Sequence, residues 1–426
     1  MASGLAFQFP ISSTPQRFKI SVNQDFLDLT RRKVADYRPT VSLSDEWQNE
    51  GPPTKVMTVI AEHWRTKYDW RSVEQTINSQ FEHYATTVQG SDDYPHPIPL
   101  HFIHQQSKST DAIPLLLLHG WPSSSLEWSK VIKPLVEHAG QSYHIVAPDL
   151  PGYGFSPAPT RPGLGPRQMG KAFDALMHQL GYARYGLVTT DLGWFTGMWM
   201  VHDVANSITA HFTDFFLAPP SPEDQARQQS GETTAEESAH MAAVGAWFKD
   251  HWGYATIHAQ KPLAMSLALT DSPVGFLGWF MDLNHGTSDG YSYTFDELIT
   301  DAMILWIPGP YANIRAYHEF FKPELQNFQR TEVPTGVSQW GWGPEPYSEL
   351  AAFPFVVRPF VVQSTAEQGS LTRRQPESWT KRVANTTFFR RHERGGHFPA
   401  VSQPEAWVQD VHDFFSSLKA ELAASK

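Results

Sequence analysis

The sequence predicts an α/β fold: a mostly parallel sheet with helices on both faces, interrupted by an inserted helical cap. Short apolar runs alternate with helical periodicity over residues 100–217, as in chains whose parallel strands are joined by crossover helices. The run 113–118 is almost entirely aliphatic, as expected for a strand buried on both faces. Between 219 and 323 the pattern becomes largely helical and rich in Trp and Tyr, which indicates a lid.

Each element is predicted from its periodicity and its breaker residues. Before residue 100, the alternating segment 18–22 predicts a strand, and two segments with helical periodicity predict helices at 26–37 and 55–81. In the core we expect strands at 100–104, 113–118, 144–147, 185–190 and 213–217, and helices at 124–137, 167–180 and 193–205. After the cap we expect strands at 356–365 and 383–390 and an amphipathic helix at 405–423.

This pattern divides the chain into four parts. Residues 1–100 are expected to form an N-terminal extension that wraps the core, because they carry little obvious chemistry. Residues 101–220 would form the first part of the core, 221–325 the helical cap, and 326–426 the second part of the core. In such sheets ligands usually bind at the carboxyl ends of the strands.

Composition and charge exclude several classes of function. The formal net charge is −11, so the long-range field disfavours nucleic acid and anionic membranes as partners. The chain has no cysteine, which excludes disulfides, thiolate metal sites and a cysteine nucleophile. Residues 1–15 lack the pattern of a secretory signal, and we expect a soluble cytoplasmic protein without a membrane anchor. Whether it forms a homo-oligomer stays open.

Three segments in the core have residues suited to catalysis. His119-Gly120-Trp121-Pro122 follows the aliphatic strand, where a glycine-containing turn can direct backbone N–H groups at a developing oxyanion; a plain tight turn is the alternative. Asp191 stands in TTDLG at a strand-to-helix junction, the position of a nucleophile elbow, although an Asp there also suits a helix N-cap. His397, in GGHF before the last helix, follows in the chain order of a nucleophile–acid–His triad.

The motifs together make the chain similar to the microsomal-type epoxide hydrolases, the branch with an N-terminal epoxide-hydrolase extension. The resemblance spans nearly the whole chain and depends on motifs that occur in the family's order. They are FKISV at 18–22, WRTKYDW at 64–70, LHFIH at 100–104, HGWP at 119–122, PDLPGYGFS at 148–156, GYATIHAQKP at 253–262, DSPVG at 271–275 and RGGHF at 394–398. The family's α/β-hydrolase fold is therefore expected here.

The resemblance implies a mechanism through a covalent ester. Asp191 matches the nucleophile that would attack an epoxide carbon, and His397 matches the base that would activate water to hydrolyse the resulting ester. The backbone N–H groups of Trp121 and Leu192 would hold the oxyanion. This elbow departs from the family, which more often has Gly before the Asp and Trp after it. Thr189, two residues before Asp191, suits the tight turn less well than Gly.

The resemblance also gives roles to two cap tyrosines, which by themselves would be taken as packing residues. Tyr254 and Tyr317 match the lid tyrosines that would hydrogen-bond the epoxide oxygen and protonate it as the ring opens. The acid that would orient His397 should follow the strand before the last one, which makes Glu367 the candidate, with Glu345 and Glu377 as alternatives.

Other functions stay open at this point. A haloalkane dehalogenase-like enzyme would share the Asp and the His but would need side-chain N–H donors for a halide. An ester hydrolase is disfavoured because the elbow has no Ser. A silent ligand-binding protein has no reason to keep all four catalytic side chains. No metal or organic cofactor is implied, because His101 and His104 lack a third ligand nearby. The expected reactants are a small-molecule epoxide and water.

Overall fold

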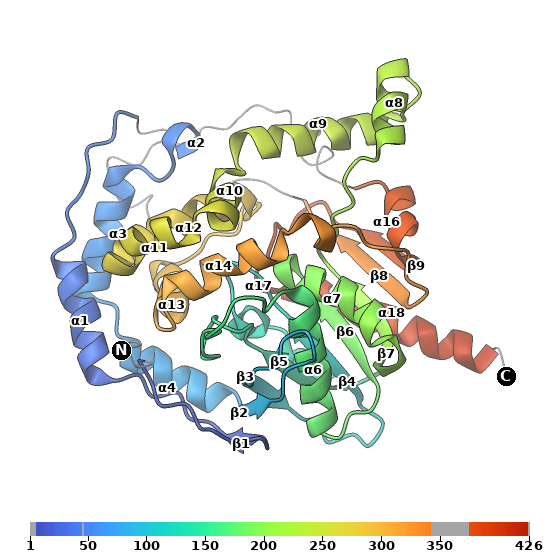
Figure 1. Ribbon diagram of the computed structural model, residues 1–426, viewed down its shortest axis with the longest axis horizontal. Coiled ribbons are helices and arrows are strands. Elements are labelled where there is room, and N and C mark those ends of the chain that lie inside the picture. The colour runs from blue at the N-terminus through green and yellow to red at the C-terminus, as the bar shows by residue number, and fades with distance from the viewer. Residues whose placement is uncertain (1–5, 45–46, 342–374, 425–426) are drawn as a thin grey trace.

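A nine-stranded sheet forms the centre of the molecule (Figure 1) in a computed structural model that describes residues 6–44, 47–341 and 375–424. The strand order is β1-β2-β3-β5-β4-β6-β7-β8-β9, antiparallel from β1 to β5 and parallel from β5 to β9. The strands are β1 Gln16–Arg17, β2 His83–Val88, β3 Ile98–Gln105, β4 Ile113–Leu118, β5 Tyr143–Pro148, β6 Tyr185–Thr189, β7 Ile208–Thr213, β8 Pro334–Gln339 and β9 Asn385–Arg391. The predicted α/β-hydrolase fold is confirmed.

Helices cover both faces of the sheet and form the cap. Those before the cap are α1 Gln24–Ala35, α2 Trp47–Glu50, α3 Thr54–Thr66, α4 Trp70–Gln80, η1 Ser125–Trp128, α5 Ile132–Val136, α6 Pro166–Gln179, α7 Asp191–Asp203 and η2 Ala205–Ser207. The cap has α8 Pro222–Ser230, α9 Ala235–Asp250, α10 Gly253–Gln260, α11 Pro262–Asp271, α12 Pro273–Thr287, α13 Phe295–Trp306, α14 Pro310–Phe320 and η3 Pro323–Leu325. The chain ends with α16 Glu377–Val383, α17 Pro399–Ser402 and α18 Pro404–Ala424.

The aliphatic strand β4 supplies both halves of the core. Leu116 and Leu118 pack on one face with residues of α6 and α7, whereas Leu115 and Leu117 pack on the other face with residues of η1, α5 and α18. All four leucines are fully buried. Because side chains alternate across a strand, an apolar residue at every position is what burial on both faces requires.

The N-terminal segment differs from its prediction. Residues 18–22 were expected to form a strand, but β1 covers only Gln16–Arg17. The backbone of 18–22 is instead held by side chains of α4: the N–H of Ile20 donates to Asn78 Oδ1 at 2.9 Å, and that of Val22 donates to Glu74 Oε1 at 2.8 Å. The alternating burial that suggested a strand therefore belongs to an extended chain packed across a helix.

Two predicted helices are broken. The segment 55–81 forms α3 and α4, separated at 67–69. There the Asp69 side chain accepts a hydrogen bond from the N–H of Arg71 and begins a new helix, as N-cap residues do. The segment 124–137 forms the short helices η1 and α5. The predicted helices at 26–37, 167–180, 193–205 and 405–423 are confirmed to within two residues.

The strand predicted at 213–217 is wrong in its position. β7 covers Ile208–Thr213 and ends where the predicted strand begins. Two strands, β2 and β8, were not predicted. The place in the sheet between β7 and β9 is taken by β8, whereas the predicted strand at 356–365 lies outside the described residues. Asp214, placed inside a strand by the prediction, directly follows β7.

The cap lies over the carboxyl ends of the parallel strands (Figure 1), with α10, α11 and α14 packed together and α9 extending across to α8. Within the described residues, no helix has the length and apolar character that a membrane crossing requires. The domain boundaries proposed from the sequence stay a prediction.

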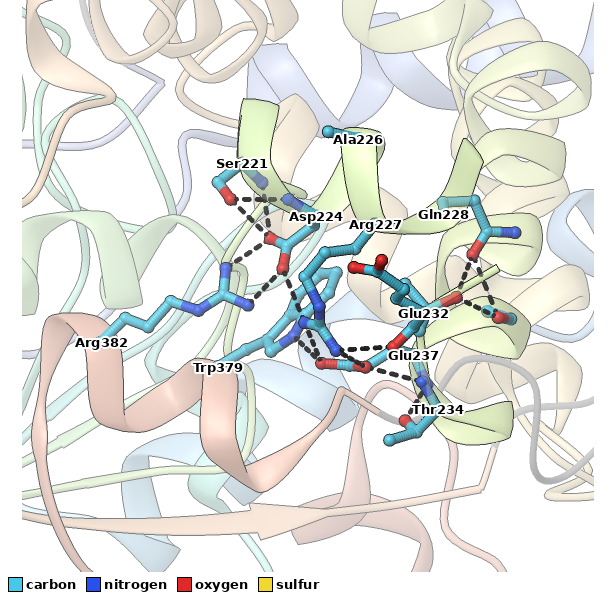
Figure 2. Close-up of polar contacts among 12 residues, drawn as sticks. Ser221, Asp224, Ala226, Arg227, Gln228, Glu232, Thr234, Glu237, Trp379 and Arg382 are labelled. Atoms are coloured by element: carbon cyan, nitrogen blue, oxygen red, sulfur yellow. Dashed lines mark hydrogen bonds and ion pairs between the residues drawn. The ribbon is translucent and has the colours of Figure 1, made fainter. Parts of the chain in front are cut away.

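A buried ion-pair network joins α8 and α9 of the cap to α16 of the core (Figure 2). Arg382 of α16 donates two hydrogen bonds to Asp224 of α8, at 2.5 and 2.7 Å. Trp379, one turn earlier, donates its indole N–H to Glu237 of α9 at 3.2 Å. Arg227 pairs with Glu237 at 3.0 Å. Both acidic side chains are at most 8% exposed, so these contacts fix where α9 lies.

Replacing Arg382 by Met should lower the free energy of unfolding by about 1–3 kcal/mol, because the Asp224 carboxylate stays buried and loses its charged donor. Urea denaturation of both proteins measures the difference. Lys381→Met on the same helix is the matched control: Lys381 pairs with Glu377 at the surface, and such a pair contributes about 0–1 kcal/mol. Equal losses in the two variants would contradict a buried anchor.

Candidate active site

Asp191 is the first residue of α7 and has a φ of +42°, a conformation that L-residues other than Asn and Asp rarely adopt. The turn brings α7 very close to β4: a Cβ on Gly193 would lie 2.2 Å from the Leu118 carbonyl oxygen. A Cβ on Gly120 would lie 2.2 Å from Asp191 Oδ1. Both positions therefore require glycine. This strained strand-to-helix turn has the geometry of a nucleophile elbow, with a carboxylate at its tip.

Thr189 fits the elbow despite its size. Its hydroxyl lies 2.7 Å from His211 Nε2 on the neighbouring strand. Its methyl group fills the space beside Gly197 of α7, where a Cβ would come within 2.7 Å. The Thr189 side chain is thus accommodated because Gly197 of α7, which packs against it, has no side chain.

One backbone N–H group donates to the Asp191 carboxylate, and a second lies on the next residue of the chain. The N–H of Trp121 donates to Asp191 Oδ1 at 2.8 Å. Leu192 is the second residue of α7, and N–H groups in the first turn of a helix have no partner within the helix. Both residues predicted for an oxyanion hole are therefore next to Asp191.

A buried network holds the turn that carries Trp121. Asp149, directly after β5, accepts hydrogen bonds from the N–H of Ser125 at 2.7 Å and of Phe155 at 2.8 Å. His101 of β3 lies 2.7 Å from the same carboxylate, and His101 and His119 hold the pKa of Asp149 down to about 2 against the effect of burial. His101 is thus a packing residue with partners in the protein.

His397 lies beside Asp191. Its Nε2 is 3.4 Å from Asp191 Oδ2, and its backbone N–H donates to the Thr287 carbonyl of the cap at 2.8 Å. Gly396 has a φ of +72°, and a Cβ there would lie 2.3 Å from the same Thr287 oxygen. The glycine before His397 therefore lets the loop approach α12 closely.

The two cap tyrosines line the same cavity as Asp191. Tyr254 of α10 and Tyr317 of α14 have ring centroids 6.0 Å apart, with the two rings edge-to-face. Trp121 stacks on Tyr254 at 5.3 Å and meets Tyr317 edge-on at 6.0 Å. Burial and the charge of Asp191 raise the pKa of Tyr254, and burial also raises that of Tyr317.

These groups line one cavity. The empty space in it, counted out to its open mouth, is about 1130 Å³. Its wall is mostly aromatic and aliphatic, which suits an apolar ligand. The lining residues are Asp191, Leu192, Phe195, Asp214, Phe215, Phe216, Leu217, His240, Ala243, Val244, Trp247, Phe248, Trp252, Tyr254, Leu283, Thr287, Tyr317, Phe321, Gln339, Trp340, Gln375 and His397. Asp214 was missed because the sequence pattern put it inside a strand.

The predicted orienting acids do not all reach the site. Glu377 begins α16 at the surface, where it pairs with Lys381 at 2.6 Å and is 45% exposed, so it is not beside His397. Glu367 and Glu345 lie outside the described residues. Among the described residues, no group of three or more His, Cys, Asp and Glu side chains is arranged to hold a metal ion.

The elbow, the backbone N–H group that donates to Asp191, and the helical cap together define an α/β hydrolase. The comparison with known proteins agrees. Residues 15–128 match the family described as "Epoxide hydrolase N terminus", and residues 113–236 match "alpha/beta hydrolase fold". The Sus scrofa protein "Epoxide hydrolase 1" is 25% identical over 95% of this chain and 89% of its own length. "Juvenile hormone epoxide hydrolase 2" of Ctenocephalides felis is 26% identical over 96% and 86%.

A solved structure shares the fold along nearly the whole chain. The Aspergillus niger epoxide hydrolase superimposes with a TM-score of 0.77 at 24% identity, covering 97% of this chain and all of that one. With its N-terminal segment and hydrolase domain in this order, the chain belongs to the microsomal-type epoxide hydrolases.

Replacing Gly193 by Ala should displace α7 and Asp191 with it, because the added methyl group would overlap the Leu118 carbonyl. We expect a loss of about 1–3 kcal/mol of unfolding free energy and, in any variant that folds, a loss of Asp191 reactivity of about 10²-fold. Thermal unfolding and alkylation by a reactive epoxide measure the two effects. Gly286→Ala on α12 is the control, because nothing lies within 4 Å of its added methyl group. Equal behaviour of the two variants would contradict the tight contact.

Proposed function

We propose that this epoxide hydrolase opens an apolar epoxide to a vicinal diol through an ester on Asp191. The single observation that carries the proposal is the position of the Asp191 carboxylate. One oxygen is held by the Trp121 N–H at 2.8 Å and the other lies 3.4 Å from His397 Nε2, and two phenol groups line the same cavity.

In the first step, an Asp191 oxygen attacks an epoxide carbon and the C–O bond of the ring breaks. The epoxide oxygen takes a proton from Tyr254 or Tyr317, leaving a phenolate. Both phenols have pKa values raised by burial, so they are fully protonated at neutral pH. They help because an epoxide oxygen leaving as a bare alkoxide in an apolar cavity would be very unfavourable.

In the second step, His397 takes a proton from water, and the resulting hydroxide adds to the ester carbonyl of Asp191. The negative charge on that oxygen is met by the N–H groups of Trp121 and Leu192. Collapse expels the diol oxygen, which takes the proton from the imidazolium. The carboxylic acid of Asp191 then returns its proton to the phenolate, directly or through water, and the enzyme is restored.

The identity of the acid that orients His397 is part of this proposal. Glu367 is the candidate by sequence and Glu345 its alternative. Since β8, the strand before the last one among the described residues, ends at Gln339, Glu345 follows it more closely along the chain than Glu367 does. Gln substitutions of each, compared in their rate of ester hydrolysis, distinguish the two.

A halide-releasing reaction finds less support. The Trp121 indole N–H, a natural halide donor, is committed to Asn313 Oδ1 at 3.1 Å. The paired tyrosines instead suit an oxygen that must be protonated. Location in the cytoplasm stays a prediction.

Wild-type protein should convert styrene oxide or an aliphatic epoxide to diol, and Asp191→Ala should not. Without the carboxylate no ester forms. His397→Gln should form the ester and hydrolyse it at least about 10²-fold more slowly, because no base activates water. Intact mass and diol formation measure both steps. Equal diol from wild type and Asp191→Ala would remove Asp191 from the mechanism, and chloride release from chloroalkanes without diol would favour the dehalogenase.

Tyr254→Phe and Tyr317→Phe should each slow ester formation by about 10-fold or more, and the double variant by about 10²- to 10⁴-fold. Because burial raises both pKa values above their ordinary value near 10, neither phenol loses its proton as pH rises from 7 to 10. The rate of ester formation in a single turnover should therefore show no alkaline decline in that range. A decline with a midpoint below 10 that is absent in a Phe variant would contradict this.

A further inference from the structure

Asp214 is a carboxylate in the wall of the catalytic cavity that the mechanism above does not use. It directly follows β7. The pairing of Thr213 with Thr189 puts Asp214 next to Thr190, the residue before the nucleophile. Asp214 therefore stands at the carboxyl edge of the sheet, one strand away from Asp191.

Only half of the Asp214 carboxylate has a structural partner. Oδ2 accepts a hydrogen bond from the Trp407 indole N–H at 2.7 Å, which ties it to α18. Oδ1 is buried and makes no hydrogen bond with any described residue. Nor does Asp214 form an ion pair with a Lys, Arg or His in the described part of the chain. The hydrogen bond to Trp407 thus explains Oδ2 of Asp214. It does not explain Oδ1, although burying a carboxylate oxygen without a hydrogen bond is costly in free energy.

The nearby group able to become positive is His397. The ring of Phe215, the residue after Asp214, meets the His397 ring edge-on with centroids 5.7 Å apart. Both Asp214 and His397 line the same cavity. Burial, the largest effect, raises the pKa of Asp214 to about 6, whereas the Trp407 hydrogen bond and a positive charge on His397 both act to lower it. At neutral pH the carboxylate is mainly ionised.

We propose that Asp214 is a positioning residue for ester hydrolysis, whose carboxylate stabilises the imidazolium of His397 from the end of β7. The proposal rests on the proposed function of the same site. The proton still moves from water to His397, and no proton passes to Asp214. Asp214 acts by lowering the free energy of the charged form of His397, as an orienting carboxylate does in a hydrolytic triad.

This role belongs to one half of the reaction. During alkylation His397 stays neutral and Asp214 has no cation beside it. During hydrolysis His397 becomes positive, and attraction between two partly buried opposite charges is much stronger than in water. Removing the charge of Asp214 should therefore slow hydrolysis and leave alkylation nearly unchanged.

Two further carboxyl groups, of Glu127 and Asp191, lie near Asp214 among the described residues. Glu127 of η1 is buried, and burial together with the charge of Asp214 raises its pKa well above the ordinary value. Glu127 therefore stays protonated and does not compete for His397. Asp191 is neutral as an ester during hydrolysis, so it does not compete at that stage either.

The test compares wild type with Asp214→Asn in single turnovers of styrene oxide. The amide keeps an oxygen that can accept the Trp407 hydrogen bond and removes only the charge. We expect ester formation within about threefold of wild type and ester hydrolysis at least about tenfold slower, so that the ester accumulates and is seen by intact mass. Asp203→Asn is the matched control. Asp203 pairs with Arg167 at 2.6 Å at the far end of α7, and both rates should stay as in wild type.

A second readout needs no substrate. Isotope-labelled histidine lets NMR follow the titration of His397, identified by its loss in His397→Gln. Asp214→Asn should lower the pKa of His397, and Asp203→Asn should not. If wild type makes no diol, the proposed function fails, while this titration still decides whether Asp214 stabilises the imidazolium.

Unchanged hydrolysis together with an unchanged His397 titration in Asp214→Asn would overturn the proposal, most clearly if Glu345→Gln or Glu367→Gln abolishes hydrolysis. Should Asp214→Asn not fold, Trp407→Phe gives the same decision, because it keeps the carboxylate and removes the donor that holds it. Slower ester hydrolysis with unchanged ester formation in Trp407→Phe supports the proposal, and wild-type rates for both steps overturn it.

Discussion

The close approach of α7 to β4 is the contact on which the catalytic geometry depends. Gly193 lets the first turn of the helix touch the Leu118 carbonyl, and Gly120 leaves room for the Asp191 side chain. Only with both contacts can the Trp121 N–H reach the carboxylate at 2.8 Å. The positive φ of Asp191 is strain that this packing holds in place, and the reactive group is thereby aimed before any substrate binds.

The cap is oriented by contacts at two separate places. Near Asp191, the Trp121 ring lies against Tyr254 and Tyr317, so the core residue whose backbone donates to Asp191 also packs against the cap tyrosines. At the other end, Arg382 and Asp224 join α16 to α8 (Figure 2). Two anchors on opposite sides of the cavity limit how far the cap can tilt, which favours a constant distance between carboxylate and phenols.

Burial explains which parts of the fold the sequence could predict. The strand at 113–118 was correct because full burial on both faces leaves only aliphatic residues there. The end of β7 was misplaced because the apolar residues Phe215–Leu217 continue past it and line the cavity instead, and this hid Asp214. β8 was missed because Gly336 weakens its pattern. Glycine is needed there since the Phe414 ring lies 2.7 Å from where a Cβ would be, a contact between distant segments.

Local sequence was also a poor guide where a residue's fit depends on a partner elsewhere. Thr189 looked too large for the elbow, yet Gly197 makes room for it. Tyr254 and Tyr317 belong to different helices and only the family resemblance predicted their pairing. The fold brings the elbow, His397 and both tyrosines together as expected. Predicting which acid lies beside His397 instead requires knowing where the strands end.

The antiparallel strands β1, β2 and β3 extend one side of the sheet. Because β2 pairs with the whole length of β3, from His83 opposite Ile103 to Val88 opposite Ile98, the backbone groups of β3 have no exposed row of donors and acceptors on that side. A shortened chain starting after β2 would present this row, next to the fully buried side chains of Leu100 and Phe102, as a template for other chains. We therefore expect the N-terminal segment to protect the sheet from aggregation, and a minimal hydrolase domain should be designed with it included.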